Sequence, residues 1–334
     1  MDISVCNDLP APYRVGFLLL DGFALFSYAA AVEPLRAANL LAGRTLYAVR
    51  ELPAEGAAAT SSSGALIRAN AHIGERVDFD LVLVVAGGDP SAYVSRRVTR
   101  WLRQLERRGV ALGGISGGPV VLGRAGLLDG RRTTVHWDHR ALLAEVAPRA
   151  RLEHARYLVE EDRLSAAGGM ASFELMRALI ARDHGAAFAR RVGDWFLQTD
   201  EPSPGAPQRS GLAERWGTTD APLLAALGAM EDHLADPLSL EQLAALAGVG
   251  PRQLNRLFAA RFGTGAIARY RALRLERAAE LLARTALPIA EVARSTGFTN
   301  AAHFSRRFRE AFGATPGSCR QQGAGGASAS ARSR

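Results

Sequence analysis

The sequence contains no lysine: all 41 of its basic side chains are arginines, against 33 acidic residues in a chain of 334. It has only two cysteines, Cys6 and Cys319, which lie near opposite ends, with no Cys-x-x-Cys pair and no Cys/His cluster. Such spacing argues against a disulfide framework and a zinc site, and it fits a reducing compartment. We therefore predict that the protein uses no metal and no other cofactor.

Long uninterrupted apolar runs are also missing. The stretch from Val15 to Val32 comes closest, but Asp21 and Gly22 divide it into pieces too short to cross a bilayer. The first residues, MDISVCNDLPAPYR, lack the basic start of a signal peptide. These features predict a cytoplasmic protein that does not bind a membrane.

Strand-like and helix-like segments alternate from residue 14 to about residue 195. The expected strands are RVGFLLL (14–20), RTLYAVREL (44–52), FDLVLVVAGG (79–88) and VALGGIS (110–116); the expected helices are 26–41, 98–109 and 118–128. Short continuous apolar runs are typical of buried parallel strands, and the alternation predicts an α/β domain over residues 12–199. Ligands of such sheets bind at the carboxyl ends of the strands, where Ser116 lies.

Composition changes after this domain. Residues 200–219 are rich in proline and glycine and predict a linker, whereas the tail 321–334 is expected to be disordered. The intervening segment 220–320 has helical periodicity and reads as an all-α domain. Its part from Arg252 to Arg320 holds 13 arginines against 4 acidic residues, a net charge of +9, while residues 1–219 carry only +2. A local basic excess predicts a nucleic-acid partner.

An internal repeat lies within this basic segment. Residues 239–263 align with 288–313, with matched alanines Ala244 and Ala293 and matched glycines Gly248 and Gly297. Each copy has the composition of a helix-turn-helix, and a long helix over 266–285 joins them. A helical bundle without DNA binding is the alternative.

In the second helix of each copy, the side chains that do not belong to the apolar face are expected to face DNA. They are Arg252, Gln253, Asn255 and Arg256 in the first copy and Ala302, His303, Arg306 and Arg307 in the second. Arginine favours guanine and asparagine favours adenine. The second copy offers poorer base readers, so we expect it to contact mainly phosphates.

The motifs LSLEQLAALAGV, RLERAAELL, IAEVARSTGF and HFSRRFREAFG resemble the DNA-binding domain of AraC-family transcription regulators over residues 222–320. In that family a serine usually caps the helix that begins after Gly250. Glycine caps nearly as well.

In the first half, Gly114-Ile115-Ser116-Gly117-Gly118 spells G-x-S-x-G, the turn on which hydrolases hold a nucleophilic serine. This turn, with VVAGGDP (84–90) and SAAGGMASFELMRALIARDHG (165–185), resembles the PfpI-type, class I glutamine-amidotransferase-like domain fused to AraC-type regulators, the GlxA group. The resemblance implies a flavodoxin-like parallel sheet. It places Ser116 where the enzymes have cysteine, His136 at the histidine position and Glu33 at a carboxylate beside the turn.

Catalysis is not expected at this turn. A serine hydroxyl is barely ionised at neutral pH and needs a base held by a third group, and only twenty residues separate Ser116 from His136. We expect a binding site for a small zwitterion instead, with the N–H groups of Ser116, Gly117 and Gly118 facing a carboxylate. Glu33 and Trp137 would face a cationic pole, which suggests an amino acid, betaine or similar zwitterion. The complete predicted set is Glu33, Gly88, Ser116, Gly117, Gly118, His136 and Trp137.

Together these observations predict a DNA-binding transcription regulator that responds to a small-molecule effector and forms a homodimer through its N-terminal domain. Two alternatives remain open at this point. One is an amidase or hydrolase that uses Ser116 and is coupled to a DNA-binding module. The other is a regulator whose first domain is only a dimerisation scaffold.

Overall fold

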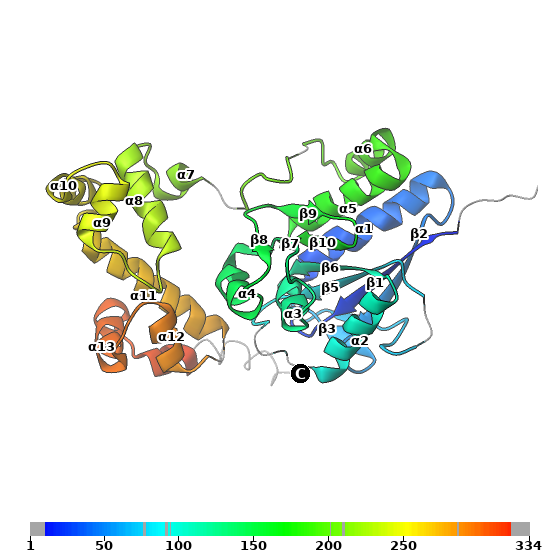
Figure 1. Cartoon of the computed structure of the whole chain (residues 1–334), viewed down its shortest axis with the longest axis horizontal. Helices are drawn as coiled ribbons and strands as arrows, with labels where there is room; N and C mark the ends of the chain where they lie inside the picture. Colours follow the sequence, from blue (N-terminus) through cyan, green and yellow to red (C-terminus); the bar gives the residue numbers. More distant parts are fainter. Residues whose placement is uncertain are drawn as a thin grey trace, which may run out of the picture. The chain divides into compact units, whose positions relative to one another are not determined.

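The structure, a computed structural model, describes residues 11–75, 78–90, 93, 95–200, 202–208, 211–285 and 287–321. The chain divides into two compact units, residues 1–208 and 209–334 (Figure 1). Cys6 and the predicted tail beyond Gln321 lie outside the described residues. No helix in the described part of the chain combines the length and the hydrophobicity that a membrane crossing needs.

A six-stranded sheet forms the centre of the first unit, in the order β2-β1-β5-β6-β10-β9. Its parallel strands are β2 (Tyr47–Pro53), β1 (Tyr13–Leu19), β5 (Leu81–Ala86), β6 (Ala111–Ser116) and β10 (Arg163–Ala166), and β9 (Tyr157–Val159) is antiparallel at the edge. Every residue of β5 is buried, as its continuous apolar run predicted. The expected α/β fold with a parallel sheet is confirmed.

Helices cover both faces of this sheet (Figure 1). One face packs against α1 (Leu25–Ala42), α5 (Met170–His184) and α6 (Ala186–Trp195), and the other against α2 (Arg96–Arg107), α3 (Gly118–Arg124) and α4 (Arg140–Val146). Successive residues of β1 alternate between the two cores, so that Phe17 faces one and Leu18 the other. Pro34 lies inside α1 without ending it, and α3 ends before the expected residue 128.

Short elements complete the first unit. They are β3 (Ala58–Thr60), β4 (Leu66–Arg68), β7 (Arg132–Thr133), β8 (Arg151–Leu152) and a 3₁₀ turn, η1 (Trp137–His139). The pairs β3–β4 and β7–β8 form separate two-stranded sheets.

The described part of the second unit is helical. It contains α7 (Leu212–Trp216), α8 (Ala221–Asp232), α9 (Leu240–Leu246), α10 (Pro251–Phe262), α11 (Ala266–Arg284), α12 (Ile289–Ser295) and α13 (Ala301–Phe312). Gly248 and Gly297 take positive φ values of 67° and 75° in the α9–α10 and α12–α13 turns, where a side chain would be strained. The predicted pair of helix-turn-helix units, joined by a long helix, is therefore present.

Two apolar clusters hold the helical unit, one on each half of α11. Leu254 and Phe258 of α10 anchor the first, and Phe304 and Phe308 of α13 anchor the second. Because these residues occupy equivalent positions in the two copies, the sequence repeat is also a repeat of packing.

Residues 200–219, predicted as a linker, contain ordered structure that their composition did not indicate. The guanidinium of Arg261 donates to the carbonyls of Trp216 and Gly217, at 2.9 and 2.8 Å, and so holds the end of α7. The Arg269 guanidinium lies 4.9 Å from the centre of the Trp216 ring, within cation–π range. Helix α7 thus belongs to the helical unit.

Phe308→Ala should destabilise the helical unit by about 3–5 kcal/mol, because a fully buried phenyl ring would leave a cavity. Phe312→Ala is the matched control, since this neighbouring ring on α13 is 43% exposed. Amide hydrogen exchange of α11–α13 in the full chain measures both losses of stability. Equal losses in the two variants would contradict the assignment of Phe308 to the core.

Candidate functional site

The two helix-turn-helix units present matching outward faces. Residues 251–260 of α10 and 301–310 of α13 show the same order of exposed, half-buried and buried positions. The exposed side chains include Arg252, Gln253 and Arg256 in the first copy and Ala302, His303 and Arg306 in the second. None of Arg252, Arg256 and Arg306 makes a hydrogen bond or ion pair with a residue in the described ranges. Their guanidinium groups are therefore available to an outside partner.

Asn255 has a different role from the one predicted. Its Oδ1 accepts a hydrogen bond from the backbone N–H of Ala266, at 2.9 Å, and so ties α10 to the start of α11. Bidentate recognition of adenine needs both the amide oxygen and the amide nitrogen. We therefore remove Asn255 from the predicted base-reading set.

Arg307 is likewise engaged within its own helix. It pairs with Glu310 at 2.9 Å, and its Nε lies 3.4 Å from His303 Nε2. These contacts place Arg307 and His303 side by side on α13, and they leave Arg306 and Arg309 as the exposed arginines of that helix.

In the first unit, β6 ends at Ser116, which takes a φ of 58°. A positive φ is rare for a residue with a side chain and gives the sharp strand-to-helix turn that the G-x-S-x-G pattern predicted. Ser116 is only 5% exposed. The turn therefore forms as expected, but its serine is covered.

The predicted anion site at the N–H groups of this turn needs correction. The Gly117 N–H donates to the carbonyl of Ala86 at 3.0 Å, so it is already used within the sheet. A Cβ on Gly118 would lie 2.0 Å from the Val84 carbonyl oxygen, which shows that this glycine packs on β5 rather than on open space. The Gly117 N–H is therefore not available to a ligand carboxylate, and one face of Gly118 is covered by β5.

A glycine pair covers Ser116. A Cβ on Gly168 would meet the Ser116 and Ser27 side chains at 2.9 Å, and the N–H of Gly169 donates to Ser27 Oγ at 2.8 Å. Ser27 is thus the α1 residue that reaches this point. Glu33 instead pairs with Arg36 on the same helix, with 2.7 Å between Oε2 and Nε.

Ser116 and His136 do not form a catalytic hydrogen bond. They meet through the backbone, where the His136 N–H lies 3.3 Å from the Ser116 carbonyl oxygen. His136 Nδ1 accepts from the N–H of Asp138 at 3.3 Å. Within the described ranges the Ser116 hydroxyl has no hydrogen-bond partner, so no base is placed to activate it.

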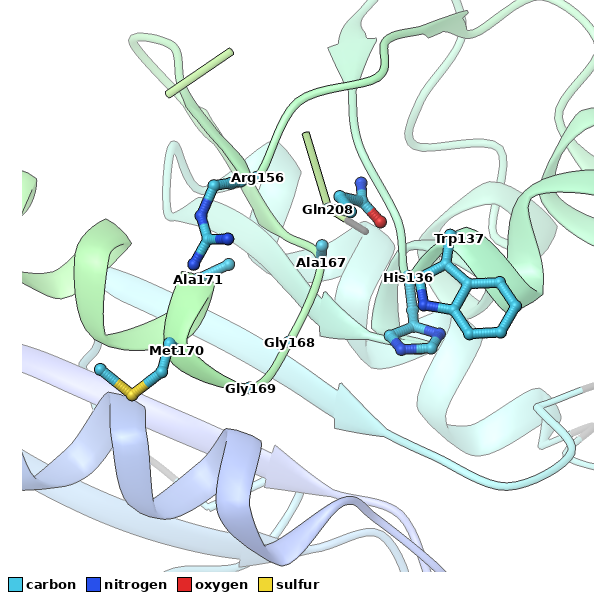
Figure 2. Close-up of a pocket in the computed structure, with 9 residues that line it drawn as sticks. All are labelled: His136, Trp137, Arg156, Ala167, Gly168, Gly169, Met170, Ala171 and Gln208. Atoms are coloured by element: carbon cyan, nitrogen blue, oxygen red, sulfur yellow. The ribbon is translucent and has the colours of Figure 1, made fainter. Parts of the chain in front are cut away.

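A cavity of about 240 Å³ opens beside this glycine pair (Figure 2). It is lined by His136, Trp137, Arg156, Ala167, Gly168, Gly169, Met170, Ala171 and Gln208. His136 and Trp137 belong to the predicted ligand set. The other five members of that set, Glu33, Gly88, Ser116, Gly117 and Gly118, are not part of the lining.

Arg156 supplies the cationic side chain of the cavity. Its Nε and Nη2 donate to the two carboxylate oxygens of Glu174, at 2.7 and 2.6 Å, and these bonds to a buried carboxylate raise the pKa of Arg156 above its usual value. The sequence reasoning missed Arg156 and Gln208. The glycine pair in SAAGGMAS, which follows a predicted strand, was the one signal that pointed to this place.

Comparison with known families agrees with this division of the chain. Residues 13–182 match the DJ-1/PfpI family, and residues 243–322 match a helix-turn-helix domain. The chain is 45% identical to the HTH-type transcriptional regulator GlxA of Rhizobium meliloti, over 96% of this chain and 99% of that protein. It is 38% identical to the HTH-type transcriptional regulator CdhR of Pseudomonas aeruginosa, over 90% of this chain and 89% of CdhR.

Solved structures resemble parts of the chain. An AraC family transcriptional regulator from Pseudomonas putida matches with a TM-score of 0.51 and 32% identity, over 55% of this chain and all 100% of that chain. A ThiJ/PfpI family protein from Pseudomonas syringae has a TM-score of 0.52 at 20% identity, over 74% of this chain and 97% of its own. This second likeness concerns the fold alone.

Gly118→Ala should destabilise the first unit by about 3 kcal/mol or more, since the new Cβ would collide with the backbone of β5. Gly88→Ala is the control: Gly88 also precedes a turn, with φ 59°, but its added Cβ meets nothing within 4 Å. Gly88→Ala should lower the free energy of unfolding only by the backbone strain of a positive φ, about 1–2 kcal/mol. Denaturant unfolding followed by tryptophan fluorescence compares the two, and a Gly118 variant as stable as the Gly88 variant would refute this packing.

A fluorophosphonate probe should leave Ser116 unlabelled, because the hydroxyl is covered and has no base. Intact-mass spectrometry of the full chain measures labelling. Stoichiometric labelling of wild type that disappears in both Ser116→Ala and His136→Ala would overturn this expectation and restore the hydrolase interpretation.

Proposed function

The chain belongs to the family of HTH-type transcriptional regulators that join a DJ-1/PfpI domain to an AraC-type helix-turn-helix domain. From this we propose that it recognises specific DNA through α10 and α13. We also propose that it responds to a small metabolite held by its first unit. One observation carries the DNA-binding geometry. The same outward positions recur in two helix-turn-helix units, and their arginines have no partner among the described residues.

The spacing of the two units suits one face of a duplex. Helix α11, which joins them, has 19 residues. Its length is about 28 Å at 1.5 Å per residue, close to the turn of B-DNA, about 34 Å. The two second helices can therefore enter successive major grooves.

The chemistry of the two faces favours a division of roles. Arg252 and Arg256 on α10 offer guanidinium groups that suit bidentate contacts to guanine. On α13, Ala302 offers only a methyl group, and Arg306 suits a phosphate or a guanine. We assign sequence reading mainly to α10 and positioning on the DNA backbone mainly to α13.

The alternative of an amidase or hydrolase is set aside. The relatives of this chain, GlxA and CdhR, are named as transcriptional regulators. This chain is therefore a regulator and not an enzyme, although the DJ-1/PfpI fold includes enzymes. The cavity beside His136 supports a ligand-binding role for the first unit over a role as a scaffold only. Homodimerisation through the first unit and a cytoplasmic location stay predictions.

Arg256→Ala in the full chain should weaken binding to a specific genomic fragment by about 1–3 kcal/mol and relax its sequence preference, as loss of a base contact does. Fluorescence anisotropy at several salt concentrations measures this. The wild type should show a steep log–log salt slope of several units because several phosphates are contacted. Arg50→Ala is the control, since Arg50 is an exposed arginine of the first unit.

Two results would count against the proposal. Failure of the wild type to retain any genomic fragment at low salt would remove DNA binding altogether. Unchanged affinity and unchanged preference in Arg256→Ala would show that α10 does not read the bases.

A further inference from the structure

The segment that leads toward the second unit borders the cavity beside His136 through Gln208. Gln208, near the end of the first unit, donates from Nε2 to Thr134 Oγ1 at 3.0 Å, to the Val135 carbonyl at 3.1 Å and to the Ala155 carbonyl at 2.7 Å. Further back in the same segment, the Pro204 carbonyl accepts from the N–H of Arg156 at 2.8 Å. Residues 202–208 are thus hydrogen-bonded to the rest of the first unit at two positions, Pro204 and Gln208.

The orientation of the Gln208 amide follows from its partners. Thr134 Oγ1 donates its proton to the Ala155 carbonyl at 2.6 Å, so toward Gln208 it can only accept. The other two partners are carbonyl oxygens. All three positions therefore require the nitrogen of the amide, and Oε1 must point the other way.

This arrangement leaves an acceptor unused. Gln208 Oε1 is buried and has no hydrogen-bond partner within the described ranges. A buried acceptor without a donor is costly, and in native proteins it commonly marks the place of a water or a ligand. Because Gln208 lines the cavity, a ligand that carries an N–H group would supply the missing donor.

The opposite side of the cavity favours a negative group. Arg156 uses Nε and Nη2 for Glu174, and its Nη1 has no bond to a described residue. Met170 and Ala171, also in the lining, begin the 15-residue helix α5, whose dipole is positive at this end, although the N–H groups of Gly169 and Ala171 already donate to Ser27 and to the Gly168 carbonyl. Figure 2 shows Arg156 and the His136–Trp137 pair on opposite sides of the Ala167–Gly169 loop, with Gln208 between them.

We propose that this cavity is the effector site, that it takes a small amino acid with a free carboxylate and a free ammonium group, and that the ammonium donates to Gln208 Oε1. The carboxylate lies at Arg156 Nη1, near the positive end of α5, while Trp137 offers its ring face to the cation. The volume of about 240 Å³ suits a metabolite rather than a larger molecule. This inference rests on the proposed function, because it names the ligand and the site of that response.

A coupling route follows from the role of Gln208. The ligand adds a bond to residues 202–208, and so it stabilises the fastened state of the segment that continues toward the DNA-binding helices. Where the DNA-bound form also favours one state of this segment, the ligand changes the affinity for DNA, and DNA changes the affinity for the ligand by the same factor.

The first experiment identifies the ligand class on the full chain. Thermal unfolding is recorded with each proteinogenic L-amino acid at millimolar concentration, and then with the methyl ester and the N-trimethyl form of each amino acid that raises Tm. At least one free amino acid should raise Tm, while its ester and its N-trimethyl form should not. A panel without any rise in Tm, or equal rises with the modified forms, would overturn the proposal.

The second experiment tests the residues by calorimetric titration of the stabilising amino acid. Gln208→Leu should weaken its affinity by about tenfold or more, the scale of one hydrogen bond to a charged group. Gln198→Leu is the matched control, since the side chain of this half-buried glutamine of the same unit bonds only to the Asp200 carbonyl among the described residues. Unchanged affinity in Gln208→Leu would overturn the role of Gln208.

Arg156 is tested together with its partner, because removing the arginine alone would leave Glu174 buried and unpaired. Arg156→Met combined with Glu174→Met should abolish measurable binding. Arg132→Met combined with Glu153→Met, which removes an exposed pair of the same geometry, should bind like the wild type. The thermal transition of each variant checks that it is folded. If a folded variant without Arg156 and Glu174 still binds the amino acid, Arg156 does not hold its carboxylate and this part of the proposal is wrong.

Coupling is measured as the change in affinity for a genomic fragment that the wild type retains, with and without the stabilising amino acid. The change should be present in the wild type and in Gln198→Leu and lost in Gln208→Leu. DNA binding by the wild type with no response to a bound amino acid would overturn the coupling and leave the proposed DNA recognition intact. Absence of DNA binding, by contrast, would count against the proposed function itself.

Discussion

The close packing of the β6–α3 turn against strand β5 is the steric constraint that decides where the first unit can hold a ligand. A Cβ on Gly118 would collide with the Val84 carbonyl, and one on Gly114 would lie 2.5 Å from the nitrogen of Pro119. Ser116 takes its positive φ to complete the turn. The protein's own backbone therefore packs tightly at the end of β6, the place where α/β enzymes of this shape present a nucleophile. The cavity lies one layer further out, beside Gly168 and Gly169.

That outer layer is organised around Arg156. Its backbone carbonyl accepts from the N–H of Ala167, its backbone N–H donates to Pro204, and its side chain holds Glu174 on α5. One residue thus connects the loop over Ser116, the start of a long helix and the segment that leaves the unit. Glu174 neutralises the charge of Arg156 and fixes the guanidinium by two hydrogen bonds. A second carboxylate at the remaining N–H groups therefore needs a cationic group in the same ligand to balance its charge.

The fold could be predicted from the sequence wherever a pattern is local. Continuous apolar runs identified the parallel strands, and the repeated alanines and glycines identified both helix-turn-helix units. The ligand site could not be predicted in the same way. Glu33 turned out to pair one helical turn away with Arg36, and Gln208 stands in a stretch whose prolines and glycines suggest a linker without contacts. Asn255 was misassigned because its partner, the start of α11, is brought close only by the tertiary fold.

The two helix-turn-helix units show how one packing scheme can serve two chemical roles. Their buried positions are equivalent, with Phe258 and Phe308 at the centres of two similar cores, so both second helices are held in the same manner. Both second helices present exposed arginines, Arg252 and Arg256 on α10 and Arg306 and Arg309 on α13. Their other outward positions differ, because Ala302 and His303 of α13 stand where α10 has Arg252 and Gln253. Since the buried positions are equivalent and the exposed ones are not, substitutions at exposed positions can change the chemistry that each second helix presents without disturbing either core.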